Sequence, residues 1–223
     1  MKRRMVSVIG TTSLLLILSG GLGVAQQLQP IMLPAPQTTG GKPVMEALSL
    51  RATSRSFAST ELSMQTLSNL LWAAWGINRS DAERHGGGKG LRTAPSASDW
   101  QETDVYVVMQ QGSYVYDATT NSLKPVVSGD YRGLTGTQLF VKDAPVTLVF
   151  VADKSKMKNA RSMAEHMMWA DAAFVSENVY IFAASEGLAT GVRASIDRSA
   201  LGNALKLSPD QEITLAQCVG FPK

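Results

Sequence analysis

Hydrophobic residues recur at helical spacing in two segments near the start of the folded part of the chain. The first predicts a short helix over residues 44 to about 55. The second begins after Ser63, a preferred N-cap residue, and Gly76 stands where helices commonly end. Its apolar residues lie on one helical face: Leu67, Leu70, Leu71, Ala74 and Trp75. The second helix is therefore predicted to face the core.

The middle of the chain has the pattern of β-strands. Residues 105–109 and 114–116 are rich in valine and tyrosine, and the Gln-Gln-Gly sequence between them is typical of a hairpin. Residues 146–152 form another apolar run of strand length. These three runs are predicted to lie in the middle of a sheet.

A long and mostly apolar helix is predicted from about residue 160 to residue 186. A helix that is hydrophobic on most of its circumference lies in a core or an interface. Gly187 is predicted to end this helix. A short helix around residues 200–206 and a strand at 213–219 complete an α+β pattern.

The N-terminal region divides into two parts before the predicted domain. Residues 1–25 have the basic start, the apolar run and the small residues of a secretory signal peptide. The apolar run is shorter than the roughly 20 residues that span a bilayer, so we expect cleavage near Gln26 and export to the periplasm. Residues 26–43 are predicted to be an extended, flexible linker, and residues 44–223 to form one domain.

Composition narrows the possible functions. The formal net charge is +3, and no basic stripe with interleaved aromatic residues argues for nucleic-acid binding. Cys218 is the one cysteine; it lies in an apolar run and is predicted to be a buried small hydrophobe. His85 and His166 form no metal-ligand pattern, so no metal site is expected. The glycine-rich segment 79–90 lacks phosphate-loop spacing and is predicted to be a mobile surface loop.

The first of three candidate binding stretches is residues 51–57. Arg51 and Arg55 are four residues apart on the predicted helical end, so both guanidinium groups can point to one side. Together with Thr53 between them, they suit a phosphate monoester. An exposed pair of this kind is also common on solvated surfaces.

The other two stretches suit a ring system. In residues 92–101, small residues surround Pro95 just before a strand, and Asp99 and Gln101 can bond the polar edge of a ring. Residues 186–195 are predicted to be a loop that leaves the long helix, with one cation, Arg193. Each stretch alone is compatible with an ordinary turn. Together the three predict a site for one large, planar, anionic ligand.

In this order the motifs resemble the nitroreductase family of FMN oxidoreductases. The chain contains Arg-x-Thr-x-Arg-x-Phe, then Ala-Pro-Ser-Ala before a strand, then Glu-Asn leading to Glu-Gly-Leu-Ala-Thr, and finally Gly-Phe-Pro-Lys. The resemblance covers residues 46–223. Within the family the chain looks most like compact exported bacterial members, and it is also similar to azoline-oxidising peptide dehydrogenases.

The resemblance implies a three-layer α/β/α sandwich with a central, mostly antiparallel sheet and a long buried helix. It also implies a homodimer that holds FMN at the subunit interface. Arg51 and Thr53 match phosphate-binding positions, Arg55 matches a second basic position, and Lys223 lies near a C-terminal basic position. The segment along the flavin ring and the polar position after it correspond to Pro95, Ser96, Ala97, Ser98 and Gln101. The loop over the other ring face corresponds to Val192, Arg193, Ala194 and Ser195.

Two positions depart from the family pattern. Asp99 stands where asparagine is common, and Ala194-Ser195 replaces a Glu-Gly pair that many members have. Acceptor specificity is therefore not transferable from those members.

The resemblance implies ping-pong hydride transfer from a reduced nicotinamide or another donor, through FMN N5, to a nitroaromatic, quinone or similar acceptor. The flavin carries this chemistry, so no side chain is assigned as catalytic. Export is unusual for an enzyme that uses nicotinamides, which are chiefly cytoplasmic. Two alternatives therefore stay open: a flavin-dependent dehydrogenase of an unidentified substrate, and an exported flavin-binding protein or apo structural dimer without turnover.

Overall fold

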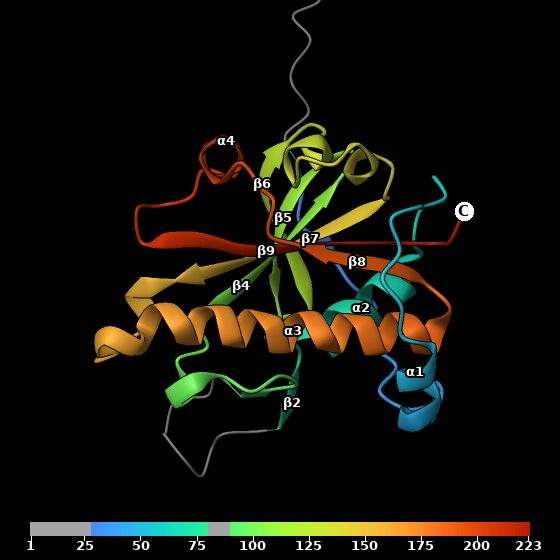
Figure 1. Ribbon diagram of the computed structural model, residues 1–223, viewed down its shortest axis with the longest axis horizontal. Coiled ribbons are helices and arrows are strands. Elements are labelled where there is room, and N and C mark those ends of the chain that lie inside the picture. The colour runs from blue at the N-terminus through green and yellow to red at the C-terminus, as the bar shows by residue number, and fades with distance from the viewer. Residues whose placement is uncertain (1–27, 80–89) are drawn as a thin grey trace, which may run out of the picture.

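A computed structural model describes residues 28–79 and 90–223 of the chain (Figure 1). The expected signal peptide and residues 80–89 of the glycine-rich segment lie outside the described residues. Within the described ranges the α-helices are α1 (Val44–Leu50), α2 (Met64–Trp75), α3 (Ala164–Glu186) and α4 (Arg198–Ala204). The strands are β1 (Ile31–Met32), β2 (Ile77–Arg79), β3 (Leu91–Arg92), β4 (Thr103–Met109), β5 (Gly112–Asp117), β6 (Ser122–Ser128), β7 (Val146–Asp153), β8 (Ala189–Arg193) and β9 (Gln211–Gly220).

A large antiparallel sheet forms the centre of the molecule. Its strand order is β1-β6-β5-β4-β7-β9-β8, and each described pair of neighbours is antiparallel. The predicted hairpin is confirmed, because Met109 pairs with Gly112 across the Gln110-Gln111 turn. A separate two-stranded sheet joins β2 and β3. The α+β class and the antiparallel sheet agree with the prediction.

The two faces of the sheet pack against different helices. On β4, Val105 and Val107 belong to the cluster that α2 and α3 cover, whereas Tyr106 and Val108 belong to the cluster that α4 covers. This alternation follows from the two-residue period of a strand. Figure 1 shows α3 on one side of the sheet and α4 on the other. The result is a three-layer arrangement in which the layer containing α4 is small.

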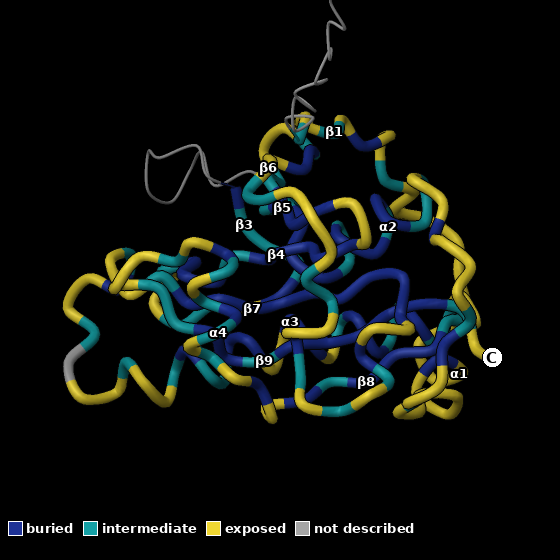
Figure 2. The backbone as a smooth tube through the Cα atoms, turned by 90° about the horizontal axis from the view of Figure 1, so that it is seen from above, coloured by how far each residue is buried: buried dark blue, intermediate teal, exposed yellow. Residues whose placement is uncertain are grey.

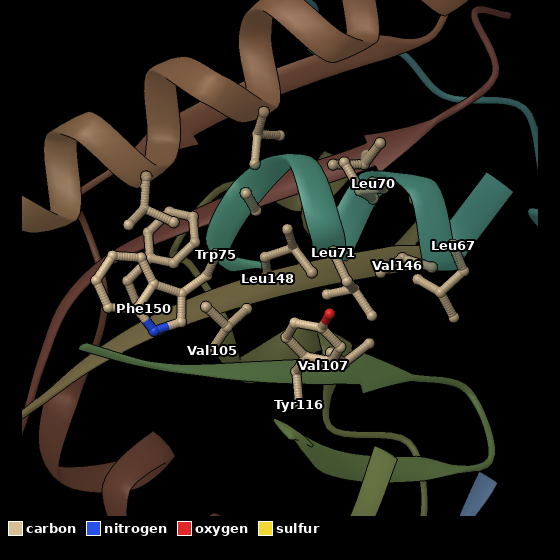
Figure 3. Close-up of a cluster of buried hydrophobic side chains, with 14 of the residues drawn as sticks. Leu67, Leu70, Leu71, Trp75, Val105, Val107, Tyr116, Val146, Leu148 and Phe150 are labelled. Atoms are coloured by element: carbon tan, nitrogen blue, oxygen red, sulfur yellow. The ribbon is translucent and has the colours of Figure 1, made fainter. Parts of the chain in front are cut away.

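The main core lies between α2 and the centre of the sheet. Figure 3 shows Leu71 of α2 directed toward Leu148 and Val107 on the strands, and Leu70 on the opposite side of the helix. Leu70 and Leu71 are completely buried. Truncating such a leucine to alanine costs about 2–5 kcal/mol. The Ser63 side chain caps α2 by accepting a hydrogen bond from the Thr66 N–H, as predicted.

The long helix α3 buries one face and exposes another. Val175, Val179 and Ala183 are buried against the sheet side, while Phe174 is 49% exposed. Gly187 ends the helix in the left-handed conformation with φ 69°, as predicted. No helix of the described residues is long and apolar enough to cross a membrane.

The structure corrects two predicted boundaries. Helix α1 ends at Leu50 rather than near Arg55, because Arg51 is already extended (ψ 121°) and the Ser54 N–H donates to the Thr190 carbonyl. The segment predicted to be an unpacked linker contains β1, which pairs with β6, and Leu33 behind it is buried. Folded structure therefore begins before residue 44 and includes residues 31–33.

The third candidate stretch is not a loop. Residues Ala189–Arg193 form β8, the edge strand beside β9. Close packing explains why Gly191 is needed there: a Cβ atom at this position would lie 2.5 Å from the Ser54 carbonyl oxygen. Strand β6, which contains Lys124 and Pro125, was not predicted either, because its polar residues and proline interrupt the apolar pattern.

Candidate functional site

The three candidate stretches fall into two groups on the surface of α3. The first and third stretches meet at Tyr180, in the C-terminal half of α3. The second stretch meets α3 at Asp171. Asp171 and Tyr180 are nine residues apart on this helix, or about 13 Å along its axis. The three predicted stretches therefore contact one helix but do not form a single cluster within one chain.

A phenol hydroxyl joins the first and third stretches. The Tyr180 hydroxyl lies 3.0 Å from Thr53 Oγ1, and it accepts a 3.0 Å hydrogen bond from the Val192 N–H. The Arg51 guanidinium lies 5.3 Å from the centre of the Tyr180 ring, within the range of a cation–π contact. We call Arg51, Thr53, Tyr180 and Val192 the Tyr180 cluster. It fixes the segment after α1 against the edge strand.

Three cations in or beside the Tyr180 cluster have no anionic partner among the described residues. Arg51 and Arg55 are exposed and make no ion pair there. Lys223 is also exposed, and it follows Pro222, which pairs with Phe57. The C-terminal residues therefore lie beside the first candidate stretch. Guanidinium and ammonium groups that are not neutralised internally are suited to binding an external phosphate.

Arg193 differs from these cations because it is directed inward. It is only 8% exposed, and its guanidinium donates to the Thr135 carbonyl, to Thr135 Oγ1 and to Cys218 Sγ, each at 3.1 Å. The side chain predicted to lie over a flavin face is thus engaged inside the protein, which leaves the exposed Ala194 and Ser195 at that position. Cys218 is buried as predicted, and burial raises the pKa of its thiol despite the nearby Arg193 charge.

The second candidate stretch is a strained turn. Ser98, Asp99 and Gln101 have φ values of 50°, 52° and 49°, in the left-handed region that non-glycine residues rarely adopt. Such conformations cost about 1–3 kcal/mol each and are found where surrounding contacts enforce them, often at functional sites. We call residues 95–101 the strained turn. Pro95 and Ser98 are exposed, whereas Ser96 and Ala97 are half-buried.

Hydrogen bonds inside the strained turn explain how this backbone is held. The buried Gln101 amide donates to the Gly90 carbonyl and to Asp99 Oδ1, both at 2.9 Å. Its oxygen accepts a 2.8 Å bond from Arg92 Nε. The Gln101 side chain, predicted to bond a ligand, therefore serves to shape the turn, and the Asp99 carboxylate is turned toward it.

A cavity of about 490 Å³ opens beside the strained turn. Its walls include Arg92, Thr93, Pro95, Ser96 and Asp99. The Arg92 guanidinium lies 5.2 Å from the Trp75 ring centre and donates to the Trp75 carbonyl, and its burial lowers the Arg92 pKa. Small and polar groups thus line an open space large enough for part of a ring system.

Three important residues escaped prediction as site residues. Tyr180 and Asp171 lie on buried positions of α3, and Glu102 is fully buried just before β4. A polar residue in an apolar helix is a weak signal for Asp171. Nothing in the local pattern distinguishes Glu102 or Tyr180 from ordinary strand and helix residues. Within the described ranges, no group of three His, Cys, Asp or Glu side chains is arranged to hold a metal ion.

Comparison with known proteins decides the family. The profile of the nitroreductase family matches residues 48–221, which is most of the chain. The chain belongs to the nitroreductase family. This membership makes the protein an oxidoreductase of a family that uses a flavin. The predicted resemblance to the nitroreductase family is therefore confirmed.

Individual nitroreductase relatives support this membership. A protein from Methanocaldococcus jannaschii that is provisionally named a nitroreductase is 25% identical over 156 residues, which cover 65% of this chain and 75% of the relative. A crystal structure from Ralstonia eutropha JMP134, also provisionally named a nitroreductase, is 38% identical with a TM-score of 0.81, covering 90% of this chain and 92% of that one.

A more distant neighbour shares the nitroreductase fold. It is an NADPH:FMN oxidoreductase from Vibrio harveyi, in complex with NAD⁺, with 16% identity and a TM-score of 0.57. The match covers 81% of this chain and 69% of that one. This likeness shows that the two proteins share a fold despite their low sequence identity.

The donor groups of this chain fit a flavin nucleotide. Arg51, Arg55 and Lys223 supply positive charge without an internal partner, as a terminal phosphate requires. The strained turn presents exposed Pro95 and Ser98 beside a cavity. Arg193 is the residue that does not fit as a side-chain ligand, because its guanidinium is engaged internally.

Proposed function

We propose that this protein is an FMN-dependent oxidoreductase that transfers hydride from a reduced nicotinamide to a quinone, a nitroaromatic compound or a similar electrophile. The observation that carries the choice of FMN is the group of free cations beside the Tyr180 cluster. A flavin without phosphate would leave Arg51 and Arg55 without an anion to bind. A comparison of FMN with riboflavin, which has no phosphate, therefore tests this choice.

Each part of the site has a separate task in this proposal. Arg51, Arg55 and Lys223 hold the phosphate, and the Thr53 hydroxyl, fixed by Tyr180, contributes a further polar contact. Residues 95–98 of the strained turn and the exposed Ala194 and Ser195 bound the ring system. When bound, FMN accepts a hydride from one substrate and passes it to the next. For a quinone, NAD(P)H and one proton yield NAD(P)⁺ and the hydroquinone.

The protein contributes binding and orientation rather than a reacting side chain. A substrate that stacks on the exposed ring face is positioned by the same turn that bounds the flavin. Rigid support for that turn keeps donor and acceptor in a fixed geometry, which is how proximity lowers a barrier. The buried bonds of Gln101 supply this rigidity.

We also propose that two copies of the chain form the complete site. Phe174 on α3 and Val44, Met45 and Leu48 on α1 are large, exposed hydrophobic residues, with Met45 77% exposed. Figure 2 shows much of α1 in yellow, the colour of exposed residues, at the edge of the molecule. Exposed apolar surface of this kind marks a protein interface. A second copy is expected to bring its own Tyr180 cluster near the strained turn of the first.

Steady-state kinetics test the proposed reaction. The FMN-loaded protein is assayed with NADH or NADPH and with menadione or nitrofurazone as the acceptor. Parallel double-reciprocal lines are expected, because the donor leaves before the acceptor binds. Bound FMN that is reduced by neither nicotinamide would favour a dehydrogenase with another donor. Bound FMN that no donor or acceptor changes would favour a binding protein.

Light scattering tests the proposed dimer. The protein without residues 1–25 is expected to run at twice its chain mass. Phe174→Glu places a charge on the exposed apolar face and is expected to shift the protein toward monomer, whereas Lys124→Ala, at an exposed position of β6, is not. A wild-type monomer at all concentrations would contradict this part of the proposal.

Export remains a proposal based on residues 1–25, which lie outside the described residues. Expression of the full chain in a bacterium, followed by N-terminal sequencing of the periplasmic fraction, tests it. A mature start near Gln26 is expected. Full-length protein confined to the cytoplasm would contradict it.

A further inference from the structure

Two buried carboxyl groups lie behind the strained turn. Glu102 is completely buried immediately before β4, and Asp171 on α3 is 3% exposed. Neither makes an ion pair with any described residue. Buried carboxylates without a cation are rare, because removing a charge from water is costly.

Both carboxyl groups bind the turn itself. Asp171 Oδ2 accepts a 2.7 Å hydrogen bond from the Ala97 N–H. Glu102 Oε2 accepts a 3.2 Å bond from Ser96 Oγ, which in turn accepts from the Gln101 N–H at 2.9 Å. The residues with positive φ, Ser98, Asp99 and Gln101, lie within the segment 96–101 that these hydrogen bonds hold. The carboxyl pair therefore enforces the strained backbone.

The electrostatics disfavour two charges on this pair. Burial, together with the charge of the neighbouring Asp171, raises the pKa of Glu102 to about 7. Glu102 Oε1 has no hydrogen-bond partner among the described residues, so it is the oxygen available to carry a proton.

Other charged groups near the pair are already engaged. Arg92 on β3 donates a hydrogen bond to the Gln101 side chain. Asp104, which lies on β4 two residues after Glu102, forms an ion pair with Lys156. Among the described residues, Asp171 is the charged group whose charge raises the pKa of Glu102. The protonation of Glu102 is thus controlled by burial and by α3.

We propose that Glu102 and Asp171 share a single proton, carried by Glu102, and act together as positioning residues that hold the strained turn in its flavin-binding shape. Loss of this proton would place two negative charges behind Ser96 and Ala97 and loosen the turn. The expected effect on flavin affinity rests on the proposed function, whereas the shared proton does not depend on it. Flavin affinity is expected to be high below neutral pH and to decrease as Glu102 ionises.

The first test uses the protein without flavin. Carbon-13 NMR of glutamate carboxyl groups is recorded from pH 5 to 9, and the Glu102 signal is identified by its absence in Glu102→Gln. A carboxyl that stays protonated until near pH 7 is expected. A Glu102 signal that is already ionised at pH 5.5 would overturn the shared proton, whether or not the protein binds FMN.

The second test measures FMN affinity by fluorescence quenching at pH 5.5 and pH 8.5. The wild type is expected to bind about tenfold more weakly at the higher pH, a change equivalent to about one pKa unit. Glu102→Gln, which cannot ionise, is expected to bind equally at both values. Glu177→Gln, an exposed carboxyl on the same helix, is expected to behave like the wild type.

The outcomes separate the two proposals. An unchanged pH dependence in Glu102→Gln would overturn the positioning role. Failure of wild type and variants to bind FMN at either pH would contradict the proposed function, while the carboxyl titration would still decide whether the pair shares a proton.

Discussion

In the Tyr180 cluster, one hydroxyl joins two segments of the chain, and the cations beside it remain free for an external anion. In the strained turn, nearly every polar side chain is engaged with another part of the protein, and the backbone adopts three positive φ values. Both regions lie against α3, about 13 Å apart along its axis. The difference indicates that the first region supplies binding energy and the second supplies shape.

The largest expected effect comes from removing free charge at the first region. Arg51→Ala combined with Arg55→Ala is expected to weaken FMN binding by about 3 kcal/mol or more, roughly 100-fold, because each lost charged hydrogen bond contributes about 1.5–3 kcal/mol. Riboflavin, which has no phosphate, is expected to bind the variant and the wild type similarly. Fluorescence titration with both ligands measures this.

Lys124→Ala provides a control, because this exposed lysine lies on β6 and pairs with Asp117. It is expected to leave both affinities unchanged. An equal loss of riboflavin and FMN affinity in the double arginine variant would show that these two arginines do not bind the phosphate.

The next effect concerns the turn and depends on pH. Because Glu102 has a raised pKa in the folded state, the unfolded state loses this proton first, at about its ordinary value. Stability is therefore expected to fall as pH rises from about 4.5 to about 7, by an amount on the order of 2 kcal/mol, and then to level off. Urea unfolding of flavin-free protein at several pH values measures this slope. Glu102→Gln is expected to reduce it, and a slope identical to that of the wild type would count against a protonated Glu102.

A smaller effect is expected at Tyr180. Tyr180→Phe keeps the ring beneath Arg51 but removes the hydroxyl that Thr53 and Val192 share. The free energy of unfolding is expected to fall by about 1–2 kcal/mol, since a buried N–H loses its partner. Chemical denaturation measures the change. Tyr131→Phe is the control, because the Tyr131 hydroxyl makes no hydrogen bond to another described residue. Equal losses of stability in both variants would contradict a stabilising role for the Tyr180 hydroxyl.

The secondary structure was largely predictable, whereas the directions of key side chains were not. Ser63 and Gly187 mark helix ends through local chemistry, and the central strands show their apolar pattern directly. The end of α1 was predicted too late, because the Ser54 bond to β8 is a tertiary contact. The third stretch was predicted to be a loop, but residues Ala189–Arg193 form an edge strand because they pair with β9, which is also a tertiary contact. Local patterns carry no information about such partners.

In the candidate site, too, the positions of residues along the chain were predictable, whereas the directions of some side chains were not. Arg51 and Thr53 were predicted as neighbours of one ligand, and the structure places both at Tyr180. Arg193 was predicted to face a ligand, but the buried Thr135 and Cys218 bind its guanidinium. The direction of a long side chain depends on distant residues. Glu102 gave no signal, because its role depends on the approach of Asp171 from another element.

The smallest expected effect tests strain in the turn. Ser98→Gly relieves a positive φ but adds freedom to the unfolded chain, so a net stabilisation of about 0.5 kcal/mol is expected. Ser199→Gly, in helix α4, is expected to destabilise by about 0.5–1 kcal/mol. Thermal unfolding of the two variants compares them. The same sign at both positions would argue against strain at Ser98.

The most direct test of the whole account is the absorbance spectrum of the protein reconstituted with FMN, recorded before and after anaerobic addition of NADPH. The account predicts protein-bound flavin bands that bleach and then return when a quinone is added. A protein that retains no flavin after reconstitution would contradict its central claim, that the Tyr180 cluster and the strained turn together form an FMN site.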